Sequence, residues 1–174
     1  MTKENLLLIG MPATGKSTLG LMLAEKLNKS FVDTDTVIEQ ISGMACHKLI
    51  DLYGIETFSK YEDQALRSQQ EKQLVISTGG SAVYCYDAMM ELKENAIVVH
   101  LSASFETLES RISNFSTRAI VMFDGMNFKD LYHERMPLYR EIADIELVTD
   151  QADDTPDESL EKVLLALKEF QSYE

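Results

Sequence analysis

The sequence predicts an α/β fold in three layers, with a parallel five-stranded sheet covered by helices on both faces. Five short apolar runs of strand length alternate along the chain with segments in which apolar residues recur at helical spacing. Three of the runs are continuous apolar runs rather than alternating ones, which is typical of strands buried on both faces of a parallel sheet. A glycine-containing turn joins the first run to the first helical segment, the arrangement of a phosphate-binding loop.

Each element has its own signal in the sequence. The first helix is expected after residue 17, because Leu19, Leu23 and Leu27 recur every four residues. The last helix should begin at Thr155-Pro156-Asp157-Glu158, where a T-x-x-E capping box has proline at the first helical position. The expected strands are Leu6–Ile9, Phe31–Val32, Leu74–Ser77, Ala96–Leu101 and Ile145–Val148.

Composition restricts the class of protein. The 174 residues suggest one domain, residues 1–174, and no apolar run reaches the roughly 20 residues of a membrane span. The N-terminus has no basic segment followed by a cleavage site, and Cys46 and Cys85 have no metal-binding or redox spacing, so we expect a cytoplasmic protein with no membrane partner. The formal net charge of −13 argues against nucleic acid as a partner.

The phosphate loop is Gly10-Met-Pro-Ala-Thr-Gly15-Lys16-Ser17. In such a loop the backbone N–H groups surround a phosphate, and the following helix N-terminus adds a positive dipole. Lys16 would reach the β- and γ-phosphates of ATP, and the Ser17 hydroxyl would bind Mg²⁺. The alternative is an ordinary strand-to-helix turn with a lysine there by chance.

Two further segments follow predicted strands and should share an edge of the sheet with this loop. Asp33 and Asp35 end the second strand; one carboxylate would hold Mg²⁺ and the other would accept a proton from an attacking hydroxyl. The alternative for Asp35 is a capping role for a helix at 36–41. Gly79-Gly80 suggests close backbone approach to a ligand, or alternatively a plain turn.

Arginine is concentrated in one region. Four of the five arginines lie within thirty residues, which would focus positive potential on a cleft in an otherwise acidic protein. Arg140 fits a solvated helix instead, whereas Arg111, Arg118 and Arg135 are candidates for the cleft. Residues 113–129 are predicted to form a lid that excludes water from the phosphate site, with an ordinary surface connection as the alternative.

With these residues in view, the chain resembles the shikimate kinase family of phosphate-loop kinases from about Leu6 to the final helix. The features shared in order are Gly10-x4-Gly15-Lys16-Ser17-Thr18-x-Gly20, Asp33-Thr34-Asp35, Gly54-x3-Phe58-x3-Glu62, Thr78-Gly79-Gly80, the pair Arg111 and Arg118, and Arg135-Met-Pro137-Leu-Tyr139. The resemblance implies a monomer with five parallel strands and a lid. It also implies transfer of the ATP γ-phosphate to the 3-hydroxyl of shikimate, a step in aromatic amino acid biosynthesis.

The resemblance also implies a role for each matching residue. Lys16, Asp35 and the lid residue Arg118 would be catalytic, and Ser17 and Asp33 would hold Mg²⁺. Shikimate would contact Asp35, Phe58, Gly79, Gly80 and Arg135, with Arg135 gripping its carboxylate. ATP would contact Gly10, Ala13, Thr14, Gly15, Lys16, Ser17, Thr18, Arg111 and Arg118, with Arg111 beside the adenine.

The sequence departs from the family where the acceptor carboxylate binds. The residue after Phe58 is an arginine in the family and Ser59 here, so Glu62 loses its usual partner, and Lys60 does not replace the guanidinium fork. Losing one such contact costs about 1.5–3 kcal/mol, or roughly 10–150-fold in affinity. Two alternatives therefore stay open: a kinase of another hydroxylated metabolite, and a nucleotide-binding regulatory or vestigial protein.

Smaller departures occur at three further positions. Ser81 stands where the family has a third glycine, and Ala119 follows the lid arginine where the family has proline. Ala13 replaces a common glycine of the phosphate loop; we expect this change to be mild, provided that the Ala13 backbone avoids positive φ.

Overall fold

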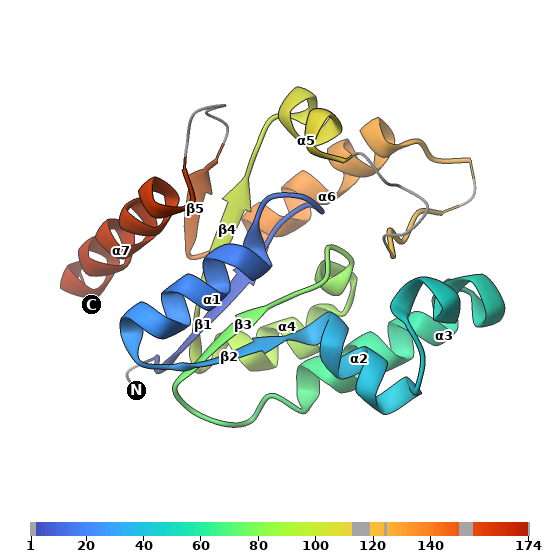
Figure 1. Cartoon of the computed structure of the whole chain (residues 1–174), viewed down its shortest axis with the longest axis horizontal. Coiled ribbons are helices and arrows are strands. Elements are labelled where there is room, and N and C mark those ends of the chain that lie inside the picture. The colour runs from blue at the N-terminus through green and yellow to red at the C-terminus, as the bar shows by residue number, and fades with distance from the viewer. Residues whose placement is uncertain (1–2, 113–118, 124, 150–154, 174) are drawn as a thin grey trace.

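The computed structural model describes residues 3–112, 119–123, 125–149 and 155–173. Within them, five parallel strands form one sheet in the order β2-β3-β1-β4-β5 (Figure 1). The strands are β1 (Asn5–Ile9), β2 (Ser30–Asp33), β3 (Leu74–Ser77), β4 (Ala96–Ser102) and β5 (Ile145–Val148). The predicted fold class is confirmed, and each strand lies within one residue of its expected bounds.

The helices follow the strands in alternation. Thr155 and Glu158 form the predicted capping box: the backbone N–H of Thr155 donates to Glu158 Oε2 (2.8 Å) and that of Glu158 to Thr155 Oγ1 (3.3 Å). The helices are α1 (Lys16–Leu27), α2 (Thr34–Ser42), α3 (Cys46–Arg67), the 3₁₀ turn η1 (Ala82–Tyr84), α4 (Tyr86–Lys93), α5 (Phe105–Arg111), α6 (Phe128–Ile142) and α7 (Pro156–Tyr173).

Successive side chains of β1 point to opposite faces of the sheet, so the strand contributes to two separate core clusters. Leu6 and Leu8 pack in the cluster that contains residues of α1 and α7, whereas Leu7 and Ile9 pack in the cluster that contains residues of α4 and α6. Figure 1 shows α1 in front of the sheet and α4 behind it. The strands β1, β3 and β4 are buried at every position, as their continuous apolar sequences predicted.

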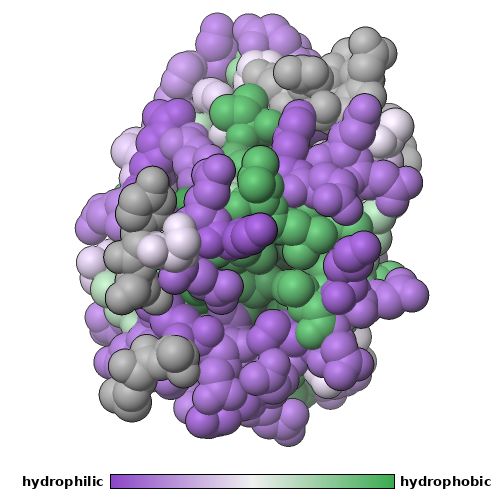
Figure 2. Space-filling model, turned by 90° about the vertical axis from the view of Figure 1, so that its left-hand side faces the viewer, coloured by the Kyte–Doolittle hydropathy of each residue, from purple (hydrophilic) through white to green (hydrophobic). Residues whose placement is uncertain are grey.

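On the side of the molecule where α1 and α7 lie, hydrophobic residues gather at the surface inside a hydrophilic surround (Figure 2). Leu21 of α1 and Leu165 of α7 are each more than half exposed. Among the described helices, none combines the length and the apolar character needed to cross a membrane.

The helices α2 and α3 lie at one end of the sheet, beside β2 (Figure 1). A third core cluster joins them through Ile38 of α2 and Leu49 and Phe58 of α3, and Val121 packs into the same cluster. Because β1, β2 and β3 are parallel neighbours, the loops after them meet at one edge of the sheet. That edge holds the phosphate loop and the segments that follow β2 and β3.

Candidate active site

The phosphate loop runs from the end of β1 to the start of α1, and its glycines are required by its shape. At Gly10, with φ of 142°, a Cβ atom would lie 2.4 Å from the Leu101 carbonyl oxygen. Gly15 has φ of 88° and is the N-cap of α1. A side chain at either position would deform the loop, which explains both glycines of the motif.

Ala13 corrects one expectation from the sequence. Its φ is 69°, in the left-handed region, so the condition under which this replacement of glycine would be mild does not hold. A residue with a Cβ atom in this region costs roughly 1–2 kcal/mol because the Cβ approaches the backbone carbonyl. The loop therefore keeps the backbone shape of glycine at position 13 at a cost in stability.

Lys16 is held at the centre of the loop by backbone carbonyls. Its Nζ donates to the carbonyl oxygens of Gly10 (2.9 Å) and Met11 (2.8 Å) and to Thr14 Oγ1 (3.3 Å). The Thr14 hydroxyl in turn donates to the Met11 carbonyl at 3.0 Å. The ammonium is thereby placed within the curve of the loop, where a phosphate oxygen could replace a carbonyl as its acceptor.

Ser17 and Asp33 meet across the gap between α1 and β2. The Ser17 hydroxyl donates to Asp33 Oδ2 at 2.6 Å and lies 3.3 Å from the Ser77 hydroxyl. Asp33 Oδ1 accepts the backbone N–H of Asp35 at 3.0 Å and caps α2. The capping role that the sequence left open for Asp35 therefore belongs to Asp33, because α2 begins at Thr34 rather than at residue 36.

Asp35 lies in the first turn of α2 and lines the central cavity. Burial raises the pKa of its carboxyl to about 6, the negative charge of Asp33 adds to the increase, and Lys16 opposes it. A carboxyl with this pKa is mostly ionised at neutral pH and is a stronger proton acceptor than an ordinary aspartate. These are the properties of a general base.

The central cavity has a volume of about 500 Å³ and joins the phosphate loop to the ends of β2 and β3. Sequence-predicted residues that line it are Ala13, Gly15, Lys16, Ser17, Thr18, Asp35, Gly79, Gly80 and Arg111. A second hollow of about 290 Å³ lies beyond Arg111, between the phosphate loop and the start of α7. Arg111 lines both spaces, and its Nη2 donates to the Thr149 carbonyl at 2.9 Å.

Gly79 and Gly80 make room for side chains of the protein itself. A Cβ atom on Gly79 would lie 2.7 Å from Asp35 Oδ1 and 2.9 Å from Glu62 Oε1. A Cβ atom on Gly80 would lie 2.9 Å from Pro12 Cδ and 3.1 Å from Arg135 Nη1. The close approach at this glycine pair is to side chains of the protein itself, and it brings two carboxyl groups and a guanidinium around one turn; the predicted approach to a ligand stays a prediction.

Arg135 and Phe58 lie behind the cavity surface. Arg135 is 1% exposed; its Nε donates to the Tyr84 hydroxyl (3.2 Å), its Nη2 donates to the Val121 carbonyl (2.6 Å), and the guanidinium stacks on the Tyr84 ring. Phe58 is 2% exposed and packs in the same core cluster as Val121. Neither residue belongs to the lining of the central cavity, so an acceptor would reach them only past Gly80 or Val121.

Glu62 has a chemical role that the sequence reasoning missed. It is 1% exposed, and its Oε1 accepts a hydrogen bond from the Ser81 hydroxyl at 2.8 Å. Burial raises the pKa of Glu62 to about 8, with a further increase from Asp35 and an opposing effect from the Ser81 hydrogen bond. The sequence contained part of the signal, since Glu62 belongs to a segment that carries the family resemblance, whereas Ser81 is a departure from the family pattern.

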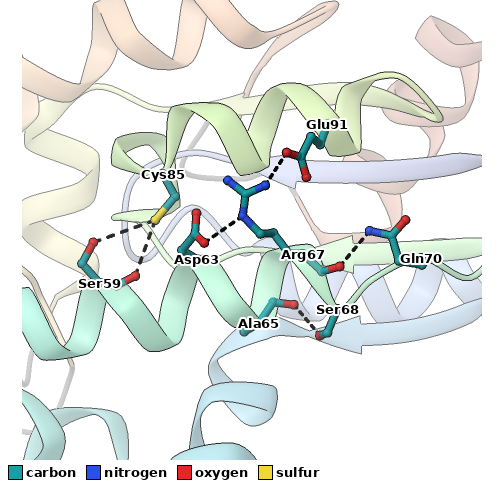
Figure 3. Close-up of polar contacts among 8 residues, drawn as sticks. All are labelled: Ser59, Asp63, Ala65, Arg67, Ser68, Gln70, Cys85 and Glu91. Carbon is teal, nitrogen blue, oxygen red and sulfur yellow. Dashed lines mark hydrogen bonds and ion pairs between the residues drawn. The ribbon is translucent and has the colours of Figure 1, made fainter.

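Ser59, the altered position, faces away from the central cavity. Figure 3 shows it on α3 beside Cys85. The Ser59 hydroxyl oxygen and the Cys85 sulfur lie 4.0 Å apart. Ser59 and Lys60 line a separate open hollow with Tyr84 and Cys85.

Arg118 and residues 113–117 of the predicted lid lie outside the described residues. Ala119 and Ile120, which follow them, line the central cavity.

Comparisons with known proteins place this architecture among the shikimate kinases. The family model described as "Shikimate kinase" matches residues 12–168. A shikimate kinase from Haemophilus influenzae (strain PittEE) is 37% identical over 154 residues, 86% of this chain and 85% of the relative. One from Vibrio cholerae serotype O1 (strain ATCC 39541 / Classical Ogawa 395 / O395) is 36% identical over 151 residues, covering 85% and 87%.

Solved structures agree with the sequence relatives. The shikimate kinase from Acinetobacter baumannii in complex with shikimate matches with a TM-score of 0.83 and 30% identity, covering 95% of this chain and 93% of that one. The enzyme from Aquifex aeolicus matches with a TM-score of 0.80 and 29% identity, covering 94% and 96%. A gluconokinase from Sinorhizobium meliloti 1021, at 14% identity and a TM-score of 0.56, shares the fold.

Proposed function

Since the chain belongs to the shikimate kinase family and is therefore a phosphotransferase, we propose that it transfers the γ-phosphate of ATP to the 3-hydroxyl of shikimate. The observation that carries this proposal is the central cavity, which Lys16 and Ser17 of the phosphate loop and Asp35 of α2 line together. A phosphate donor bound at the loop would meet a hydroxyl acceptor at Asp35. Asp35 is the proposed base for the acceptor hydroxyl, and Lys16 the cation that stabilises the transferred phosphoryl group.

We propose that Ser17 and Asp33 hold the Mg²⁺ ion that accompanies ATP. The ion prefers oxygen ligands, and the hydroxyl and carboxylate oxygens lie 2.6 Å apart beside the phosphate loop, so this donor set fits. When bound, Mg²⁺ neutralises charge on the phosphate oxygens. Arg111 is the proposed contact for the nucleotide base, because it lines the hollow beyond the phosphate loop. The catalytic role of Arg118 stays a prediction.

The direct test is ADP production in a coupled assay with Mg²⁺ and ATP, with and without shikimate. We expect strong stimulation by shikimate, with Lys16→Ala as the blank. ATP binding without stimulated ADP production would contradict the proposal and favour the nucleotide-binding regulatory protein. Because the described residues of one chain supply both ends of the cleft, and both cysteines are free thiols, we propose a cytoplasmic monomer with a small-molecule substrate.

A second candidate is a kinase of another hydroxylated metabolite, and two observations at the acceptor end favour it. Ser59 supplies no guanidinium, and Nη2 of Arg135 is bonded to the Val121 carbonyl. The discriminating variant is Ser59→Arg, which should lower KM for shikimate about tenfold if shikimate is the acceptor. Lys60→Arg is the matched control, since it adds a guanidinium one position along. An unchanged KM for every carboxylated acceptor in Ser59→Arg would show that the acceptor pocket has been rebuilt, in keeping with the separate hollow that Ser59 lines.

A further inference from the structure

Arg135 and Glu62 are oppositely charged residue types that are both buried and do not pair. Each is 1% exposed, yet the ion pairs found among the described residues include neither of them. Buried arginine and glutamate side chains normally neutralise each other, because an isolated buried charge is expensive. The absence of an ion pair between Arg135 and Glu62 therefore has to be explained by the contacts that each of them makes.

Each group is held by neutral partners on its own side of the turn at 79–81. Arg135 donates to the Tyr84 hydroxyl and the Val121 carbonyl, and its Nη1 lies beside Gly80. Glu62 lies beside Gly79 and accepts the hydroxyl hydrogen of Ser81. The two groups thus lie beside neighbouring residues of the turn, and Ser81 supplies the hydrogen bond that holds the carboxyl beside Gly79.

Burial keeps Glu62 protonated near neutral pH by raising its pKa to about 8. The charge of Asp35 on α2 adds to this increase, whereas the Ser81 hydrogen bond and the charge of Arg135 on α6 oppose it. Glu62 itself acts on Cys46, Cys85 and Tyr139. Burial raises the pKa of both thiols to about 12 and raises that of the phenol further, so these three groups stay uncharged near neutral pH. Asp35 supplies the negative charge in this set.

With Glu62 protonated, none of the ion pairs among the described residues neutralises Arg135. Guanidinium groups bind carboxylates strongly, and because Nε and Nη2 of Arg135 already donate to Tyr84 and Val121, Nη1 is the nitrogen through which it would bind one. Nη1 lies 3.1 Å from the Cβ position of Gly80, a residue that lines the central cavity, so an anionic group in that cavity would approach the buried guanidinium past Gly80.

We propose that Ser81 is a specificity-determining residue, whose hydroxyl holds the Glu62 carboxyl away from Arg135 so that the guanidinium can bind an anionic group of the acceptor. This inference rests on the proposed function, since it concerns the acceptor of the same reaction. It assigns to Ser81 a positioning role, exerted through Glu62, and not a contact with the reacting atoms.

The test compares Ser81→Ala with the double variant Ser81→Ala/Glu62→Gln. In Ser81→Ala the freed carboxylate should turn to Arg135, and KM for shikimate should rise about tenfold, while kcat and KM for ATP stay within about twofold. In the double variant the uncharged amide cannot form that ion pair, so KM should return to within about twofold of the parent value. Ser102→Ala, which removes a similarly buried hydroxyl from β4, should leave KM unchanged.

An unchanged KM in Ser81→Ala, or no recovery in the double variant, would overturn the inference.

A second readout needs no turnover and therefore separates this inference from the proposed function. The folded-state pKa of Glu62 is raised from 4.5 to about 8, so the stability that it contributes is complete below pH 4.5 and is lost as pH rises through 8.

The melting temperature of the parent should therefore fall more steeply between about pH 5 and pH 8 than that of Glu62→Gln. Ser81→Ala should also lose this slope, because a carboxylate paired with Arg135 is ionised throughout. A slope in Ser81→Ala equal to that of the parent would show that Ser81 does not hold Glu62 apart. Absence of shikimate-dependent turnover in every variant would instead count against the proposed function.

Discussion

The two ends of the central cavity are built in different ways. At the phosphate end, one contiguous segment from Gly10 to Ser17 supplies most of the groups, and Lys16 is held by backbone carbonyls of its own loop. At the acceptor end, Asp35, Glu62 and Arg135 come from three helices and converge on the turn at 79–81. A local motif determines the first end, whereas tertiary packing determines the second.

This difference teaches where the family's chemistry can vary. The phosphate loop tolerates little change at its two motif glycines, because a side chain on Gly10 would collide with the Leu101 carbonyl and one on Gly15 would be strained at positive φ. The acceptor end can exchange one polar partner for another, as the contact between Ser81 and Glu62 shows. Substitutions at the two ends should therefore change different kinetic constants. Those at the phosphate end should change kcat and KM for ATP, and those at the acceptor end should change KM for shikimate.

The largest effect is expected at the phosphate end, from Lys16→Ala. Loss of the ammonium at the transferred phosphoryl group should lower kcat by about 10²–10³-fold or more. Circular dichroism and the melting curve should still report a folded protein. Lys26→Ala, which removes an exposed lysine from the last turn of the same helix, should leave kcat unchanged. Retention of kcat in Lys16→Ala would remove its proposed role.

Gly79→Ala should act on the acceptor end alone. The added methyl group would press on Asp35 Oδ1 and Glu62 Oε1, which lie 2.7 and 2.9 Å from the Cβ position. We expect KM for shikimate to rise at least about tenfold through displacement of these carboxyls, with a fall in kcat where Asp35 moves. Nucleotide affinity, measured by calorimetry, should stay within about twofold. A weakened nucleotide affinity with normal acceptor binding would break the comparison.

Arg111→Ala should give a smaller effect with the opposite selectivity. Loss of the guanidinium between the central cavity and the second hollow should raise KM for ATP about 3–10-fold, the loss expected for one contact of this kind. KM for shikimate should not change. Arg140→Ala, which removes an exposed arginine paired with Glu146, is the control and should affect neither constant.

The smallest effect is expected from Ala13→Gly, which should raise stability. Relief of the positive φ gains roughly 1–2 kcal/mol, and the greater flexibility of glycine in the unfolded chain offsets up to about 1 kcal/mol of it. The melting temperature should therefore rise by about 2–4 °C. Ala24→Gly, within the regular part of α1, should lower it. A lower melting temperature in Ala13→Gly would show that the loop is not strained at this position.

The fold could be predicted because its signals are local. Continuous apolar runs gave the strands to within one residue, and Thr155 and Glu158 gave the start of α7, because period, burial and capping act over a few neighbouring residues. The phosphate loop could be predicted for the same reason, because its motif is a local sequence pattern. Its residues are adjacent in the chain, so the sequence pattern and the site coincide.

The acceptor end depends on contacts that spacing does not record. The hydrogen bond of Ser81 to Glu62 and that of Arg135 to the Val121 carbonyl join segments 19 and 14 residues apart through packing of the helices. Some element boundaries also lie beyond the sequence signals. The backbone conformation of Ala13 depends on where β1 ends and α1 begins. Moving the expected start of α2 by two residues, from 36 to 34, transfers the capping role from Asp35 to Asp33.

The position of β1 at the centre of the sheet has a consequence for how the chain is made. Residues 6–8 leave the ribosome before their partners, which are residues 75–77 on β3 and residues 97–99 on β4. This apolar part of β1 must therefore wait unpaired until both partner strands have been synthesised. Because such long-range parallel pairing forms slowly, we expect the nascent chain to be most prone to aggregation during this interval.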